Sequence, residues 1–192
     1  MLDMGPYYIT ALVNLIGPVA RVSGMASRSR SRRLIGSEPL KGQSIDVMVD
    51  THVAGTLEFA SGAVVSIATS FDVAKHTCKP IELHGTLASL QVPDPNRFGG
   101  PVFMAAPGQE WSEVALTHGY HDGNFRSIGV ADMAHALSAA RAHRASGELA
   151  LHVLEVMEAI QVSSDSGRHV TIASRPPRSA PLPSDLPPGL LD

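Results

Sequence analysis

The feature that most constrains the fold is a β-hairpin signature within residues 47–73. In VMVDTHVAGTLEF, every second residue from Val53 to Phe59 is apolar or glycine, with polar or small residues between them. After a Ser61-Gly62 turn, the alternation resumes in ASGAVVSIATSFDV. Alternation with period two is typical of half-buried strands, and a short glycine-containing turn joins antiparallel neighbours. The segment therefore predicts two paired antiparallel strands.

The same pattern recurs on both sides of this hairpin. VARVSGMAS at 19–27 is a further candidate strand. PIELHG and LASLQV flank a turn at Gly85-Thr86, and PVFMAA and WSEVAL flank a turn at Pro107-Gly108. Strands that follow one another through short turns indicate an antiparallel sheet.

Helical patterns lie at the two ends of the chain. Residues 3–16 carry an apolar stripe at helical spacing, with Asp3 in position to cap the first turn and Gly17-Pro18 to end the helix. Residues 128–143 and 147–162 show the same periodicity. The proline-rich residues 175–192 predict an extended or disordered tail.

This order predicts an α+β fold, in which an open, mostly antiparallel β-sheet has helices packed on one face. The other face also carries apolar residues, and the helices are too few to cover both faces. We therefore expect that face to be used for oligomerisation, in a homodimer or a higher homo-oligomer. Residues 1–174 are expected to form one domain, followed by the tail at 175–192.

Composition argues against several classes of function. With 192 residues, 44% of them hydrophobic, the chain can bury a core, and its net charge of −3 gives no support to nucleic-acid binding. The arginine-rich stretch SRSRSRR at 27–33 is interpreted as a solvated loop between strands. We find no pattern of a membrane span or a secretory signal, so we expect no membrane partner and a cytoplasmic location. The single cysteine, Cys78, is expected to be a partly buried small hydrophobe.

Three motifs in this order resemble one known family. They are L-D-M-G-P-Y at the start, the strand-rich T-x-x-x-x-x-L-x-F-x-S-G-A-V followed by I-E-L-H-G-T, and the closing F-R-S-I-G-V-A-D-M-A with H-R-A-S-G-E-L-A-L-H-V-L-E-V-M. Over residues 1 to about 175 the chain resembles the C-terminal domain of the glucose–fructose oxidoreductase / inositol dehydrogenase / MocA superfamily.

The resemblance implies a function. Family members are NAD(P)-dependent oxidoreductases in which a Rossmann domain binds NAD or NADP and this domain supplies the substrate pocket and the oligomer contact. No G-x-G-x-x-G turn follows a strand here. We therefore expect a substrate-binding and oligomerisation domain for a sugar, polyol or related alcohol, truncated and inactive alone. The alternative is a stand-alone dimeric binding or scaffold module without catalysis.

The resemblance also points to site residues. Asp3 and Tyr7 lie four positions apart, so they share one helix face, and the family pattern implies catalytic roles for both near the reacting carbon. Tyr7 could move the proton that accompanies hydride transfer. In the loop THGYHDGNFR, His118, His121 and Arg126 are expected to bind substrate.

The histidines also raise the question of a metal. His118, His121 and Asp122 could ligate one, but their spacing matches no standard zinc motif, and we expect no metal site. His135, His143 and His152 lie on or near predicted helices and are each expected to be surface or half-buried residues.

Overall fold

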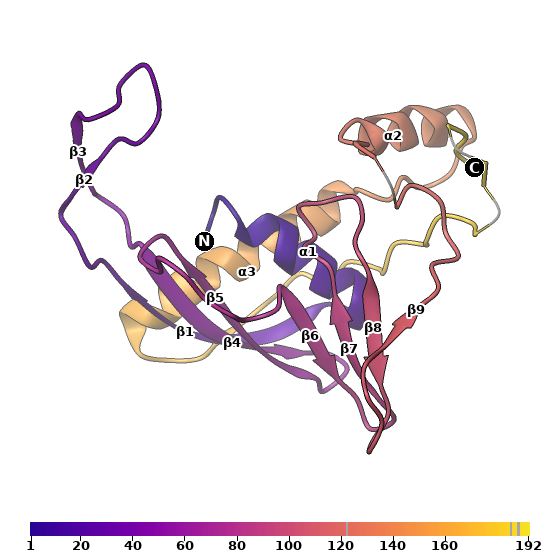
Figure 1. Ribbon diagram of the computed structural model, residues 1–192, viewed down its shortest axis with the longest axis horizontal. Coiled ribbons are helices and arrows are strands. Elements are labelled where there is room, and N and C mark those ends of the chain that lie inside the picture. Colours follow the sequence, from indigo (N-terminus) through magenta and orange to yellow (C-terminus); the bar gives the residue numbers. More distant parts are fainter. Residues whose placement is uncertain (122, 185, 188) are drawn as a thin grey trace. The chain divides into compact units, whose positions relative to one another are not determined.

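The computed structural model describes residues 1–121, 123–184, 186–187 and 189–192, and these divide into two compact units (Figure 1). Unit 1 comprises residues 1–76 and 151–176, and unit 2 comprises residues 77–150 and 177–192. The elements in chain order are α1 Gly5–Ile16, β1 Val19–Ser27, β2 Arg32–Leu34, β3 Ser44–Asp46, β4 His52–Phe59, β5 Val64–Ser70, β6 Ile81–His84, β7 Ser89–Val92, β8 Val102–Ala105, β9 Ser112–Val114, α2 Ile128–Ser138, α3 Gly147–Ser166 and β10 Val170–Thr171.

Unit 1 is built on a four-stranded antiparallel sheet in the order β10-β1-β4-β5. The β4–β5 hairpin confirms the strongest pattern in the sequence, with Val53 opposite Thr69 and Leu57 opposite Val65. Gly62 turns the hairpin at φ 87°, a conformation that glycine adopts without steric cost. The predicted strand at 19–27 is β1 at the same bounds.

Helices α1 and α3 lie on the same side of this sheet in Figure 1. Two glycines that face each other across β1 and β4, Gly24 and Gly55, leave room for Ile160 of α3. A Cβ atom at Gly24 would lie 2.5 Å from the Ile160 Cγ2 atom, so the close approach of α3 requires glycine there. The apolar core of unit 1 is made of fully buried side chains from these elements, including Ile9, Val13, Val19, Val22, Leu57, Phe59, Val156 and Ile160.

Strands β2 and β3 form a separate two-stranded ribbon that projects away from the rest of unit 1 (Figure 1). The arginine-rich stretch, interpreted from the sequence as a loop, runs into this ribbon at Arg32 and Arg33. All three residues of β3 are exposed. The ribbon has no alternating apolar pattern, which explains why the sequence did not predict it.

Unit 2 contains the second four-stranded sheet, in the order β6-β7-β8-β9, with every pair antiparallel. The β6–β7 and β8–β9 hairpins turn at the predicted Gly85-Thr86 and Pro107-Gly108 positions. Helix α2 ends at Ser138, earlier than the predicted residue 143. The described tail residues of this unit hold no helix or strand, yet several make hydrogen bonds.

The α+β class with antiparallel strands is confirmed. The described strands are hydrogen-bonded as three sheets, where the sequence suggested one. Cys78 is exposed, so the expectation that it is partly buried was wrong: it lies in the irregular segment between β5 and β6, outside both cores. Among the described residues no helix has the length and apolar character needed to span a membrane.

Candidate functional site

The first site residues surround the start of α1. The helix begins at Gly5, its N-cap residue is Met4, and no side chain caps it. The Gly5 N–H donates to the Met1 carbonyl at 2.7 Å, Pro6 has no N–H, and the Tyr7 N–H donates to the Met4 carbonyl at 3.2 Å. The nearby donors are therefore already used, and the prediction that Asp3 caps the helix was wrong. Its exposed carboxylate is left available for another partner.

Asp3 lines a shallow pocket in unit 1. The other lining residues are Met1 and Met4 from the same turn, Thr51 just before β4, and Thr69, Ser70 and Phe71 from the end of β5. Tyr7 is not among the residues that line this pocket, although its side chain is 37% exposed one helical turn further on. The structure thus separates the two predicted catalytic residues: Asp3 faces this pocket, and Tyr7 opens to solvent beside it.

Hydrogen bonds fix the strand ends that form the pocket wall. The Phe71 N–H donates to the Thr51 carbonyl at 2.8 Å, and the Thr51 hydroxyl donates to the Asp72 carboxylate at 2.6 Å. The hydrogen bond from Thr51 holds the pKa of Asp72 below its ordinary value, with weaker contributions from Ser29 and Arg33. Thr51 and Asp72 carry no motif of their own, and sequence reasoning missed them.

The loop expected to bind substrate lies in unit 2. His118, His121 and Arg126 are all exposed. The hydroxyl of Thr117 and Nδ1 of His118 are 3.0 Å apart, and the Tyr120 hydroxyl donates to the Leu190 carbonyl at 2.5 Å. These three residues belong to a different compact unit from Asp3 and Tyr7, so each group is described within its own unit.

Asp122, the remaining candidate metal ligand, lies outside the described residues. Among the residues that are described, no three side chains of His, Cys, Asp or Glu come together in a way that could hold a metal ion. The interpretation of His118 and His121 as polar loop residues therefore does not depend on a metal.

Three arginines of the stretch at 27–33 have partners inside unit 1. Arg28 donates to the Val47 carbonyl at 2.6 Å, and Arg32 forms an ion pair with Asp46 at 3.2 Å. The Arg33 guanidinium lies 5.7 Å from the centroid of the Phe71 ring. These contacts assign the three side chains a role in holding the β2–β3 ribbon and its base.

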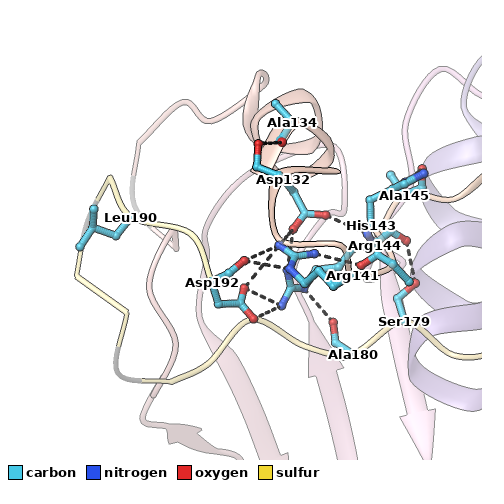
Figure 2. Close-up of polar contacts among 12 residues, drawn as sticks. Asp132, Ala134, Arg141, His143, Arg144, Ala145, Ser179, Ala180, Leu190 and Asp192 are labelled. Atoms are coloured by element: carbon cyan, nitrogen blue, oxygen red, sulfur yellow. Dashed lines mark hydrogen bonds and ion pairs between the residues drawn. The ribbon is translucent and has the colours of Figure 1, made fainter. Parts of the chain in front are cut away.

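A second polar cluster, missed from the sequence, lies in unit 2 around Asp132 of α2 (Figure 2). Asp132 is only 4% exposed, and its carboxylate accepts hydrogen bonds from Arg141 at 2.7 Å and from the Arg144 guanidinium and backbone N–H. Burial opposes ionisation of Asp132, but these hydrogen bonds outweigh it and lower its pKa to about 2. Arg144 also contacts both carboxylate oxygens of Asp192, at 2.8 and 3.0 Å.

A third cluster surrounds His152 of α3 in unit 1. His152 is 0% exposed, so the expectation of a surface or half-buried residue was wrong. Both ring nitrogens have hydrogen-bond partners within the protein, which is why the ring can be buried. The Val19 N–H donates to Nε2 at 3.0 Å, which places the ring proton on Nδ1, 2.8 Å from the Ser174 hydroxyl. Ser174 in turn donates to Glu155. Burial lowers the pKa of His152 and keeps the ring neutral.

The described residues do not fit a dinucleotide. Every strand pair among them is antiparallel, so they contain no parallel strand–helix–strand unit of the kind that presents a helix N-terminus to a pyrophosphate. A nicotinamide cofactor would have to be held by other residues.

Comparison with known proteins identifies a matching family model. Residues 1–91 match the family model of the GFO/IDH/MocA C-terminal domain, which confirms the resemblance seen in the sequence over that range. No curated protein matches the chain.

Several solved structures share the fold. Levoglucosan dehydrogenase in its apo form is similar at 20% identity and a TM-score of 0.73, covering 90% of this chain and 50% of its own. Its complex with NADH and levoglucosan matches at 21% identity and a TM-score of 0.70, over 89% of this chain and 49% of that one. Aldose-aldose oxidoreductase from Caulobacter crescentus, complexed with glycerol, matches at 20% identity and a TM-score of 0.66, over 88% and 46%. The chain thus spans about half the length of these proteins.

Proposed function

Residues 1–91 belong to the GFO/IDH/MocA C-terminal domain family, and on that premise we propose that this chain is the substrate-binding and oligomerisation domain of an NAD(P)-dependent oxidoreductase. Its substrate is a sugar, a polyol or a related alcohol. The similar structures include a dehydrogenase in complex with NADH and levoglucosan and an oxidoreductase in complex with glycerol, which supports this substrate class. The dinucleotide is bound by protein outside the described residues.

The observation that carries the proposal is the exposed Asp3 carboxylate beside a pocket with hydroxyl side chains in its wall. Because no backbone N–H of the helix start uses this carboxylate, it can accept a hydrogen bond from an alcohol group. A carboxylate acceptor forms a stronger hydrogen bond than a neutral one. Asp3 thereby orients the substrate alcohol at the start of α1.

Tyr7 is proposed to move the proton of that alcohol. Its phenol lies in the first turn of α1, four residues along the chain from Asp3, and is open to solvent, so it can exchange a proton with a substrate seated over the helix start. The nicotinamide, when bound, supplies the hydride acceptor or donor. Within unit 2, the exposed loop residues His118, His121 and Arg126 are proposed to bind substrate hydroxyls.

The open face of the unit 1 sheet is the proposed contact with a second copy. On the face opposite α1 and α3, the exposed residues include Met25, Thr56, Val64 and Ser66, and Arg21 pairs with Glu58 across the strands. Met25 of β1 is 80% exposed, which is unusual for an apolar side chain in a paired strand and favours burial against a partner. A homodimer would cover it.

The test measures binding of levoglucosan, L-sorbose and glycerol to the 192-residue chain by saturation-transfer NMR. We expect binding of at least one probe, and Asp3→Asn should weaken it about tenfold, since the amide is a poorer acceptor than the carboxylate. Glu158→Gln, on the exposed face of α3, is the matched control and should bind as the unmodified chain does.

Two outcomes would contradict the proposal. If no probe binds while sedimentation shows a dimer, the chain is a scaffold module and not a substrate domain. If a probe binds and Asp3→Asn leaves its affinity unchanged, binding occurs elsewhere and Asp3 has no part in it.

A further inference from the structure

One residue in the wall of the pocket beside Asp3, Thr69, carries a polar atom that no described residue satisfies. The hydroxyl oxygen of Thr69 is buried and has no hydrogen-bond partner among the described residues. A buried hydroxyl without a partner is unfavourable, because water solvates it in the unfolded chain. Such an atom in a pocket wall indicates a place where a bound molecule completes the hydrogen bonding.

The neighbouring hydroxyls differ from that of Thr69 in having partners. Thr51 donates to Asp72 at 2.6 Å, and the Ser70 hydroxyl accepts from the Asp72 N–H at 3.1 Å. Asp72 thus holds two of the three hydroxyl residues in the pocket wall in a fixed arrangement. Thr69 stands opposite Val53 in the β4–β5 register, so rigid strand pairing fixes its position.

The chemistry of the wall indicates the ligand. Asp3 offers a negatively charged acceptor, Thr69 a group that both donates and accepts, and Phe71 an apolar surface. A neutral molecule with adjacent hydroxyls and C–H faces matches all three, whereas an anion would be repelled by Asp3. A sugar ring or a short polyol has this character.

We infer that Thr69 is a substrate-positioning residue, which hydrogen-bonds the hydroxyl next to the one held by Asp3. The inference rests on the proposed function and deepens it, because it names the sheet residue that hydrogen-bonds a second substrate hydroxyl. A substrate with two adjacent hydroxyls would be held at both, and one lacking the second would leave Thr69 unsatisfied.

The experiment uses the full chain with ¹³C-labelled threonine methyl groups, titrated with levoglucosan. We expect the methyl signals of Thr69 and Thr51 to shift, and that of Thr86, exposed in the turn between β6 and β7, to stay in place. Thr69→Val, which replaces the hydroxyl by a methyl group, should weaken binding about tenfold, the effect of losing one well-placed hydrogen bond. Thr69→Ser keeps the hydroxyl and should bind within about threefold of the unmodified chain.

A thermal melt separates binding from folding. Thr69→Val should melt at the same temperature or higher, because the hydroxyl that it removes has no internal partner. Thr86→Val, in the exposed β6–β7 turn, is the control and should alter neither affinity nor the threonine shifts at the pocket. A clear fall in melting temperature for Thr69→Val would show that the hydroxyl has a structural partner, and would overturn the inference.

The remaining outcomes distinguish this inference from the proposed function. If levoglucosan binding is lost in Asp3→Asn but unchanged in Thr69→Val, the proposed function stands and the role of Thr69 is overturned. If neither levoglucosan nor glycerol binds the unmodified chain, the proposed function fails, and the inference fails with it.

Discussion

Among the residues that the structure describes, each unit of the protein buries one titratable side chain on a helix, and the two are accommodated by opposite means. His152 in unit 1 is 0% exposed and Asp132 in unit 2 is 4% exposed. His152 is kept neutral by burial, with the Val19 N–H on one ring nitrogen and the Ser174 hydroxyl on the other. Asp132 is kept charged by two arginines.

Because of this difference, the two units should lose stability at different acid pH values. In both cases the folded state lowers the pKa, so the unfolded chain binds the proton more readily and stability falls as the pH falls. For His152 the loss begins below the ordinary histidine value of 6.5. For Asp132 it begins below 3.8 and is complete near its folded pKa of about 2. Unit 1 should therefore loosen at a higher pH than unit 2.

The largest expected effect is that of Asp132→Asn. The amide keeps the size of the side chain but leaves Arg141 and Arg144 without the buried anion between them. Removing one partner of a buried ion pair is strongly destabilising, and we expect a loss of about 3 kcal/mol in the free energy of unfolding of unit 2. Urea unfolding followed by the fluorescence of Trp111, the one tryptophan of the chain and a unit 2 residue, measures it.

Glu113→Gln is the matched control for that experiment. Glu113 lies exposed on β9 in the same unit and should change stability by less than about 0.5 kcal/mol. A loss for Asp132→Asn no larger than for this control would mean that the arginines find equally good partners without Asp132. The contrast between the two units would then disappear.

His152→Leu should have a smaller effect, confined to unit 1. The substitution removes the acceptor for the Val19 N–H and a partner of Ser174, and we expect it to destabilise the unit by about 2 kcal/mol at pH 7. It should also remove the fall in stability between pH 7 and pH 5, because leucine cannot take up a proton. Hydrogen exchange at the amides of β1 and α3, compared at the two pH values, is the measurement.

His169→Gln provides the control for the pH dependence, because His169 is exposed in the same unit. This variant should keep the acid loss of the unmodified chain. If His152→Leu also keeps it, another group in unit 1 carries the pH dependence, and the burial of neutral His152 does not set it.

These two buried residues also show what the sequence could and could not predict. The strands β1, β4 and β5 and the turns between hairpins follow from local alternation and glycine, so they were predicted at or near their observed bounds. Strand β10, of two residues, forms only because β1 offers it an edge, as in the pairing of Thr171 with Arg21. Nothing in its own sequence predicts that pairing.

The candidate site divides in the same way. Asp3 was predicted as a site residue from its motif. The structure adds Thr51 and Thr69 to the pocket that Asp3 lines, because the folding of β4 and β5 brings them there from a distant part of the sequence, and Asp72 holds Thr51 in place. His152 and Asp132 each sit in an ordinary helical pattern, and their burial depends on partners from Val19, Ser174, Arg141 and Arg144. A single-residue pattern contains no signal of such partners, so the sequence predicted His152 as a surface or half-buried residue.

The smallest expected effect concerns Asp192, which shares the arginines of Asp132 but is exposed (Figure 2). Its carboxylate lies 2.8 Å from the Arg144 Nη2 atom and 3.7 Å from Arg141, and Arg144 holds its pKa below the ordinary value. Exposed ion pairs are weak and are screened by salt, whereas buried pairs are screened much less. Asp192→Asn should therefore lower the melting temperature of unit 2 slightly at low ionic strength, and about 0.5 M NaCl should abolish the difference. The loss of stability in Asp132→Asn should persist at that salt concentration. Thermal melts of the two variants, followed by Trp111 fluorescence, make the comparison. Equal salt sensitivity of the two variants would contradict the assignment of Asp132 as the buried partner and Asp192 as the solvated one.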